Sequence, residues 1–292
     1  MNHSFHSLSS INFEKWELTE REFLLFRDLI YAKTGISLRA NKCPMLTARL
    51  QRRLRALNLA SFESYHQFLL TQDPSGEERR ELINCVTTNK TSFFREQHHF
   101  TFLDHLLQNS IASAAAPRPF CVWSAACSTG EEPYSIAMTL RNVLDRSSAG
   151  RDFSVLATDI DTQVLESARS AIYLESDLEP VPPLFRQRFF LRGSGSQAGR
   201  FRVKPGLREH IDFRPLNLID PAWDVNAAFD VIFCRNALIY FEHETQNRIL
   251  RRLITYLKPH GHLFVGHSEH LHWMMDVLEP VGTTMYRVKH AG

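Results

Sequence analysis

The stretch from Phe120 to Ser135 constrains the fold more than any other part of the chain. It opens with a short apolar run that ends at Trp123, passes through small residues, turns at Gly130 and continues into an amphipathic segment. This order predicts a strand, a tight loop and a helix. In a parallel sheet, small side chains in such a loop let a cofactor approach the backbone, and the following helix offers free N–H groups. The stretch lacks the full glycine pattern G-x-G-x-x-G, so an ordinary α/β crossover remains an alternative to a nucleotide-type site.

A second strand is predicted at the spacing of a βαβ unit. The apolar run Phe153 to Ala157 is followed closely by two acidic residues, Asp159 and Asp161. In dinucleotide and S-adenosylmethionine sites alike, a carboxylate in this position accepts hydrogen bonds from ribose hydroxyls. The alternative is that a carboxylate here caps the next helix. We assign Asp159 to the ribose and Asp161 to the helix cap.

Length and composition are those of an ordinary globular protein. The 292 residues are enough for one large or two ordinary domains, and 43% hydrophobic with 23% charged residues is typical of soluble proteins. No segment reaches the roughly 18 apolar residues that a membrane span needs, and the first residues are polar. We therefore expect a cytoplasmic protein without membrane insertion.

The cysteines and histidines give no sign of a metal site. The five cysteines are odd in number and widely spaced, without a C-x-x-C pair, which favours reduced thiols over disulfides or zinc. The densest histidine group, His267, His270 and His272, lacks a companion carboxylate at a metal-ligand spacing. No metal is expected.

The N-terminal part predicts a small all-α domain. Thr19 to Glu22 is a capping box, and the apolar helix face that follows stops at Gly35. Further helices are predicted from near Pro44 and over about 61–70 and 77–86. The second helix lies in a segment, 29–62, that contains no acidic residue, although the whole chain carries only +2. Its basic side is either a solvated face or a docking surface for an acidic partner, made of Arg49, Arg52, Arg53 and Arg55.

The segment Thr87 to Glu96 joins the two predicted domains. It is polar, then aromatic, then charged, without a clean period, which is often the texture of a linker. Because the pair Phe93 and Phe94 is an unusual thing to leave in solvent, we predict a strap that lies over the cofactor cleft. Residues 111–119, rich in Ala, Ser and Pro, are the more ordinary linker.

The C-terminal half contains further strand signals. Two β-like runs surround a Gly/Ser-rich loop in Phe189 to Val203, which predicts a small hairpin insertion with an exposed edge. Phe229 to Cys234 is the strongest buried-strand signal, and Arg235 and Asn236 follow it directly, so they are expected to point into the ligand crevice of a doubly wound sheet. Other strands are predicted at 210–216, at 262–266 and, as an edge strand, at 283–289.

Five motifs extend these observations. They are TNKTSFFR at 88–95, STGEEPYS at 128–135, ATDID at 157–161, CRNALIYF at 234–241 and GHSE at 266–269. In this order and at these spacings they resemble the CheR family, the S-adenosylmethionine-dependent glutamate O-methyltransferases of bacterial chemotaxis receptors. The resemblance covers about residues 18 to 288. The family pattern has a bulkier pair of residues before Ile239 than Ala237 and Leu238. We expect this difference to affect packing more than chemistry.

The resemblance implies the fold and the cofactor site. The fold is a class I (Rossmann-like) α/β methyltransferase domain, whose sheet ends in an antiparallel strand and which carries a small β-subdomain, preceded by an all-α N-terminal domain. The cofactor is S-adenosylmethionine, with S-adenosylhomocysteine as product. One cofactor contact falls on Glu132, and the neighbouring Glu131 is the alternative for it. The implied cofactor contacts are Asn89, Thr91, Arg95, Glu132, Asp159, Asn217, Leu218, Arg235 and Asn236.

The residues are also consistent with the implied chemistry. A glutamate side chain, with a pKa near 4.3, is already a carboxylate nucleophile at neutral pH and needs no general base, so alignment dominates. Arg95 is the candidate for orienting the carboxylate, because its planar fork matches that geometry. Tyr240 is the second catalytic candidate, as a hydrogen-bond donor to the carboxylate or a wall beside the methyl group. The alternative for Arg95 is a structural ion pair with Glu96 or Asp104.

These inferences give an expected organisation and function. We expect a leader at 1–17, a helical substrate-docking domain at 18–90, a strap and linker at 91–119, and a methyltransferase domain at 120–292 with its β-subdomain insertion at about 188–205. The expected reaction is methylation of chemoreceptor glutamates. The expected partners are receptor helices and, at the β-subdomain, a C-terminal receptor peptide.

The sequence also bears on alternative functions, nucleic-acid binding and the oligomeric state. A low-turnover module that binds the cofactor and tethers a receptor is the alternative to an enzyme, and a dehydrogenase is disfavoured because the turn at Gly130 lacks the glycine pattern. Nucleic acid is not expected as a partner. One short basic helix in a chain of net charge +2 offers little positive surface for binding phosphates. We expect a monomer.

Overall fold

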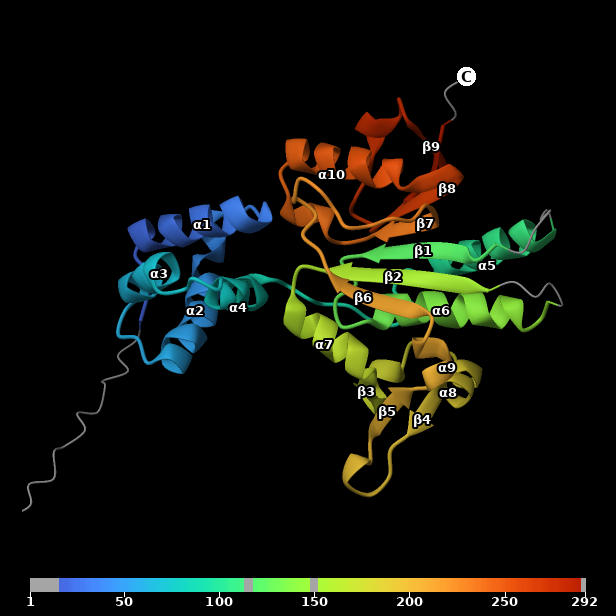
Figure 1. Cartoon of the computed structure of the whole chain (residues 1–292), viewed down its shortest axis with the longest axis horizontal. Helices are drawn as coiled ribbons and strands as arrows, with labels where there is room; N and C mark the ends of the chain where they lie inside the picture. The colour runs from blue at the N-terminus through green and yellow to red at the C-terminus, as the bar shows by residue number, and fades with distance from the viewer. Residues whose placement is uncertain (1–15, 113–117, 148–151, 290–292) are drawn as a thin grey trace, which may run out of the picture. The chain divides into compact units, whose positions relative to one another are not determined.

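The chain divides between Val86 and Thr87 into two compact units. The computed structural model describes residues 16–112, 118–147 and 152–289 (Figure 1). Most of the predicted leader, and residues 113–117 of the predicted linker, lie outside the described residues.

The first unit is helical, as predicted. The capping box is confirmed, because Thr19 accepts a hydrogen bond from the backbone N–H of Glu22 while the Glu22 carboxylate accepts one from the backbone N–H of Thr19. Gly35 ends the first helix in a left-handed conformation. One apolar core joins the helices, with Phe26 stacked on Tyr65. The helices are α1 (Glu20–Thr34), α2 (Cys43–Leu57), α3 (Phe62–Thr71) and α4 (Glu77–Val86), with a 3-10 turn, η1 (Ala40–Lys42), before α2.

The second unit is built on a seven-stranded sheet with the order β6-β2-β1-β7-β8-β10-β9. The strands from β6 to β8 are parallel, and β10 is antiparallel to both of its neighbours. This confirms the predicted fold class. The strands are β1 (Phe120–Ala125), β2 (Phe153–Asp159), β6 (Ile211–Pro215), β7 (Phe229–Cys234), β8 (Leu257–Val265), β9 (Leu278–Gly282) and β10 (Met285–Val288).

The prediction of an edge strand at 283–289 was wrong. This segment contains β10, which lies between β8 and β9 and buries Met285 and Tyr286. The strand at this edge of the sheet is β9, whose Pro280 cannot donate to a strand ladder and suits an edge. The sequence pattern missed β9 because proline and glycine within it weaken the strand signal.

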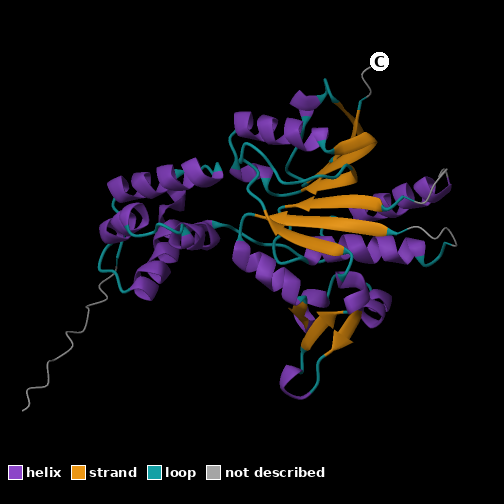
Figure 2. Ribbon diagram, in the orientation of Figure 1, coloured by secondary structure: helices purple, strands orange, loops and turns teal. Residues whose placement is uncertain are grey.

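Successive residues of the central strands face opposite sides of the sheet, so each side has its own core. On β1, Val122 belongs to the core formed with α5 and α6, whereas Trp123 belongs to the core formed with α10. Helices therefore cover both faces (Figure 2). They are α5 (Gln97–Ala112), α6 (Glu131–Leu144), α7 (Thr162–Ser170) and α10 (His243–Thr255). Helix α5 lies inside the segment that we predicted as strap and linker, and this helix was not predicted.

A small three-stranded sheet, in the order β3-β5-β4, forms the β-subdomain. The predicted hairpin corresponds to β4 (Phe190–Arg192) and β5 (Arg200–Val203), and β3 (Ile172–Leu174) adds a strand that was not predicted. With only three residues, β3 is too short to show a period. The short elements of this unit are η2 (Glu175–Leu178), α8 (Pro183–Phe189), η3 (Gly195–Gln197), α9 (Pro205–Arg208), η4 (Leu238–Tyr240) and η5 (His272–Met274).

Candidate active site

The turn between β1 and α6 is sharply bent. Ala126 and Ser128 have positive φ angles of 72° and 51°, and Gly130 has a φ of 99°. A Cβ on Gly130 would lie 2.8 Å from the Tyr173 hydroxyl and 2.9 Å from the Cβ of Ala168, so only glycine fits. Small residues and close packing thus fix this turn at the carboxyl end of β1, where open α/β sheets bind ligands.

Asp159 holds the turn from the end of the neighbouring strand β2. Its buried carboxylate accepts hydrogen bonds from the backbone N–H groups of Ser128, at 2.8 Å, and Asp161, at 3.0 Å. Burial raises the pKa of Asp159 to about 6. Because each carboxylate oxygen has two acceptor positions, both oxygens keep capacity for a ligand.

Asp161 is the cap of α7, as predicted. It accepts hydrogen bonds from the backbone N–H groups of Gln163 and Val164. Its second oxygen accepts from the Thr87 hydroxyl, at 2.6 Å, and from the Asn89 amide, at 2.7 Å. The start of the predicted strap is therefore tied to the loop after β2.

The loop after β7 is organised by a residue that the sequence analysis did not place in the site. Buried Glu269 accepts four backbone N–H groups, with N···O distances of 2.6 to 3.3 Å, from Gly266, Asn236, Leu238 and Ile239. A Cβ on Gly266 would lie 2.2 Å from the Asn236 side-chain nitrogen. Glu269 belongs to the GHSE motif, but its role depends on contacts more than 30 residues away in sequence.

Arg235 joins two acidic residues and the strap. Its guanidinium lies 3.2 Å from the Glu132 carboxylate and 3.5 Å from the Glu96 carboxylate, and it donates to the backbone carbonyl of Arg95 at 2.5 Å. The other oxygen of Glu132 accepts from Ser124. Burial raises the pKa of Glu132, and the charge of Arg235 opposes that shift. Glu131 instead accepts from Thr129, so the two neighbouring glutamates have different surroundings.

The catalytic candidates lie on the strap and after β7. Arg95 is half-buried and donates to the carbonyl of Lys90 at 3.1 Å. It forms no ion pair with any carboxylate in the described ranges, since Glu96 pairs with Arg235 and Asp104 with Arg146. The strap is anchored by its aromatic residues, which are buried in the core of this unit. Tyr240 is half-buried on η4.

The other predicted cofactor residues lie on the strap and after β6. Thr91 is half-buried on the strap, and Asn217 follows β6, where its carbonyl accepts from the indole of Trp223. Leu218 is buried in the same apolar core as Trp223. Because β6, β2, β1 and β7 are adjacent and parallel, their carboxyl ends bring Asp159, Asn217, Leu218, Arg235 and Asn236 to one edge of the sheet.

The predicted docking arginines divide into two pairs. Arg53 forms a bidentate ion pair with buried Glu78, at 2.6 and 2.9 Å, and Arg49 donates to the Val86 carbonyl. Both stabilise the helical unit itself. Arg52 and Arg55 are exposed on α2.

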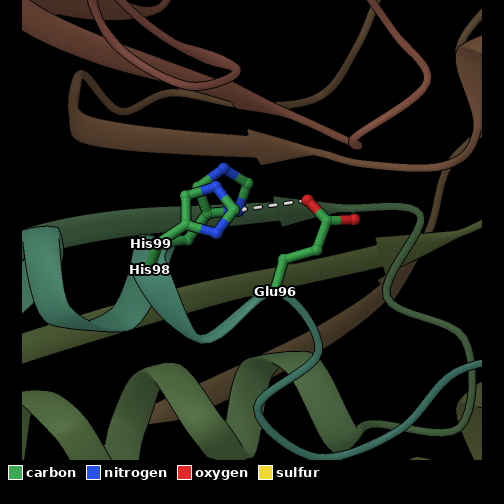
Figure 3. Close-up of side chains that lie close together, drawn as sticks. All are labelled: Glu96, His98 and His99. Carbon is green, nitrogen blue, oxygen red and sulfur yellow. Dashed lines mark ion pairs between the residues drawn. The ribbon is translucent and has the colours of Figure 1, made fainter.

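Among the described residues, the three histidines that sequence spacing singled out do not form one group of metal ligands. The rings of His270 and His272 stack 5.8 Å apart, while His267 lies beside Glu96. The structure instead brings Glu96 together with His98 and His99 (Figure 3).

Comparison with known sequences identifies the family. Residues 89–287 match the CheR methyltransferase SAM-binding domain, and residues 21–87 match the CheR methyltransferase all-alpha domain. The chain belongs to the CheR methyltransferase family. It is 46% identical over 274 residues to a chemotaxis protein methyltransferase of Escherichia coli, covering 94% of this chain and 92% of that protein. It is 42% identical over 273 residues to chemotaxis protein methyltransferase 2 of Pseudomonas aeruginosa, covering 94% of this chain and 95% of that one.

The CheR family chain is thus an S-adenosylmethionine-dependent methyltransferase of chemotaxis, with S-adenosylhomocysteine as product. Its residues fit this cofactor: a tight turn of small residues after β1, a buried carboxylate with free acceptor positions after β2, and polar side chains after β7. A dehydrogenase is excluded by the family. No helix among the described residues has the length and apolar character to cross a membrane.

Proposed function

We propose that this CheR protein methylates glutamate side chains of chemoreceptors and forms methyl esters. S-Adenosylmethionine, when bound, supplies a methyl group on a positively charged sulfur. The acceptor, a glutamate with a pKa near 4.3, is already ionised at neutral pH. The protein's task is then to hold the acceptor oxygen in line with the methyl group, which can supply much of the acceleration.

The surroundings of Arg95 carry this proposal. Its guanidinium donates to one backbone carbonyl and forms no ion pair among the described residues. The charge of Arg95 acts on nearby Glu132, but Glu132 and Glu96 are both paired with Arg235. A half-buried guanidinium that keeps donors available suits a substrate carboxylate, because its fork binds both oxygens. Asn89, Thr91, Glu132, Asp159, Asn217, Leu218, Arg235 and Asn236 would hold the cofactor, and Tyr240 would border the acceptor.

The test is incubation of the protein with labelled cofactor and cytoplasmic receptor fragments. The proposal predicts label that mild base releases, because esters are hydrolysed by base, whereas base-stable label would indicate an amine or nucleic-acid acceptor. Arg95→Ala should abolish labelling while S-adenosylhomocysteine still binds in calorimetry. Arg146→Ala, an exposed arginine, is the matched control. Cofactor binding by the unmodified protein without any labelling would support a tethering module instead.

We also propose that the helical unit docks the receptor through exposed Arg52 and Arg55. Receptor methylation sites lie on helices rich in glutamate, and exposed complementary charges act mainly through contacts that salt screens. Arg52→Glu with Arg55→Glu should raise the KM for receptor and leave cofactor affinity unchanged. Arg80→Glu, on the exposed surface of α4, is the control. An unchanged KM would make the arginines a solvated face only.

The β-subdomain is our proposed site for a C-terminal receptor peptide. An extended peptide can add to a free sheet edge, and tethering raises the local concentration of substrate without touching the chemistry. The edges are β3 and β4, where Leu174 and Leu191 are exposed. Fluorescence titration with receptor C-terminal peptides should show binding that is lost when residues 193–199 are deleted. An absence of binding to every such peptide would leave only the helical contact.

A further inference from the structure

Glu96, His98 and His99 lie together where the strap meets α5. One ligand atom from each residue lies within 4.8 Å of the others (Figure 3). His99 is fully buried and stacks on Phe264, whereas His98 is exposed. This group lies outside the residues assigned above to the cofactor or to the methyl acceptor.

The Nε2 atoms of both imidazoles are engaged by the segment before β10, which leaves the Nδ1 atoms as the candidate ligand atoms. His98 Nε2 lies 3.2 Å from the carbonyl oxygen of Thr283, which can only accept, so that nitrogen carries the proton. His99 Nε2 lies 3.0 Å from the Thr284 hydroxyl, which donates its own proton to the Thr283 carbonyl. In the tautomer in which this hydroxyl donates to the carbonyl, His99 Nε2 donates to the hydroxyl oxygen. In a neutral imidazole, the Nδ1 atom of each ring is then a bare acceptor.

Two acceptors face one another inside the protein. His99 Nδ1 lies 3.7 Å from Glu96 Oε2, and neither atom has a hydrogen-bond partner among the described residues. The other oxygen of Glu96 is used by Arg235 and His267. Two buried lone pairs in this arrangement favour a positive ion that both can coordinate.

We propose that Glu96, His98 and His99 bind a divalent transition-metal ion of the zinc class. Two imidazoles and a carboxylate are donors that this class prefers, whereas calcium and magnesium prefer sets of oxygen ligands. The hydrogen bonds to Thr283 and Thr284 supply the outer support that orients histidine ligands. The ion would share Glu96 with Arg235, which couples its binding to the candidate active site.

The test is titration of the metal-free full chain with Co²⁺, followed by visible absorption, with Zn²⁺ as competitor. The wild type should develop absorption bands that Zn²⁺ removes. His98→Gln changes an exposed residue and should fold normally; its affinity for Co²⁺ should fall by at least about tenfold. Glu96→Gln should do the same. The double variant His270→Gln, His272→Gln, which removes a neighbouring histidine pair, should bind as the wild type does.

Three results would overturn the proposal. They are the absence of bands in the wild type, bands that are unchanged in His98→Gln, and bands that are lost only in the His270, His272 variant. The third would identify an adventitious surface site. Circular dichroism and urea unfolding confirm that each variant is folded, and neither readout requires a receptor substrate or the cofactor.

Discussion

The turn after β1 and the loop after β7 are each held by one buried carboxylate, but the two carboxylates are used differently. Asp159 accepts two backbone N–H groups, whereas Glu269 accepts four. A carboxylate has about four acceptor positions, so Glu269 is saturated by the protein and Asp159 is not. The comparison separates a residue that shapes a loop from one that shapes a loop and can still bind a ligand.

Glu269→Gln should have the largest effect. An amide keeps one acceptor oxygen and turns its NH₂ group toward backbone donors, so buried N–H groups lose their partner. We expect the free energy of unfolding to fall by roughly 3 kcal/mol or more and methylation to be lost with the loop. Urea unfolding measures the first and a labelling assay the second. Glu166→Gln, at an exposed position of α7, should change stability by less than about 0.5 kcal/mol. A Glu269→Gln protein as stable as this control would contradict the structural role.

Asp159→Asn should weaken cofactor binding more than it lowers stability. The amide removes acceptor positions that we assign to the cofactor, so the dissociation constant for S-adenosylhomocysteine should rise by about tenfold or more. The loss of stability should be smaller than for Glu269→Gln, because fewer backbone groups depend on Asp159. Calorimetry and urea unfolding give the two numbers. Unchanged cofactor affinity would show that Asp159, like Glu269, serves only the loop.

Asp159 could be predicted from the sequence, whereas the role of Glu269 could not. Asp159 was found because it closely follows a buried apolar run at βαβ spacing, and Asp161 was assigned correctly as the cap because that bond is local. Glu269 was missed because its partners at Asn236 and Leu238 are distant in sequence and no period connects them. Contacts across space, unlike caps and strand patterns, leave no local signal.

The same limit applies to the other errors. The bond between Arg53 and Glu78 spans 25 residues, so a basic helix face looked uniform although half of it stabilises its own domain. Helix α5 has an apolar face at Phe100, Leu103 and Leu107, but the polar and aromatic residues before it made the segment resemble a strap. The parallel core, by contrast, was predictable because its strands are continuous apolar runs.

The pH dependence of cofactor binding tests whether ionised Asp159, unlike Glu269, binds the cofactor. Burial raises the pKa of Asp159 from 3.8 to about 6, and the negative charge of Asp161 adds to this shift. If the ionised form accepts the ribose hydroxyls, affinity for S-adenosylhomocysteine should fall by about tenfold for each pH unit below that pKa.

The stability of the cofactor-free protein should move in the opposite direction. Because the pKa is higher in the folded state, the contribution of Asp159 is fully present below pH 3.8 and is lost as the pH rises through about 6. Calorimetry and urea unfolding between these values measure both slopes. Asp159→Asn should flatten them, and slopes that persist in this variant would assign the titration to another group.

The smallest effect should come from removing a tyrosine hydroxyl that hydrogen-bonds to the turn after β1. The Tyr173 hydroxyl donates to the carbonyl of Thr129 at 2.8 Å, and the Tyr134 hydroxyl donates to the carbonyl of Ala168, on α7, at 2.9 Å. Tyr173→Phe and Tyr134→Phe each remove one buried hydrogen bond, so each should lower the free energy of unfolding by about 1 kcal/mol. Only Tyr173→Phe loosens the turn, and it should weaken S-adenosylhomocysteine binding by about two- to threefold. Equal effects of the two variants on cofactor affinity would mean that the turn is held entirely by Asp159 and by the packing around Gly130.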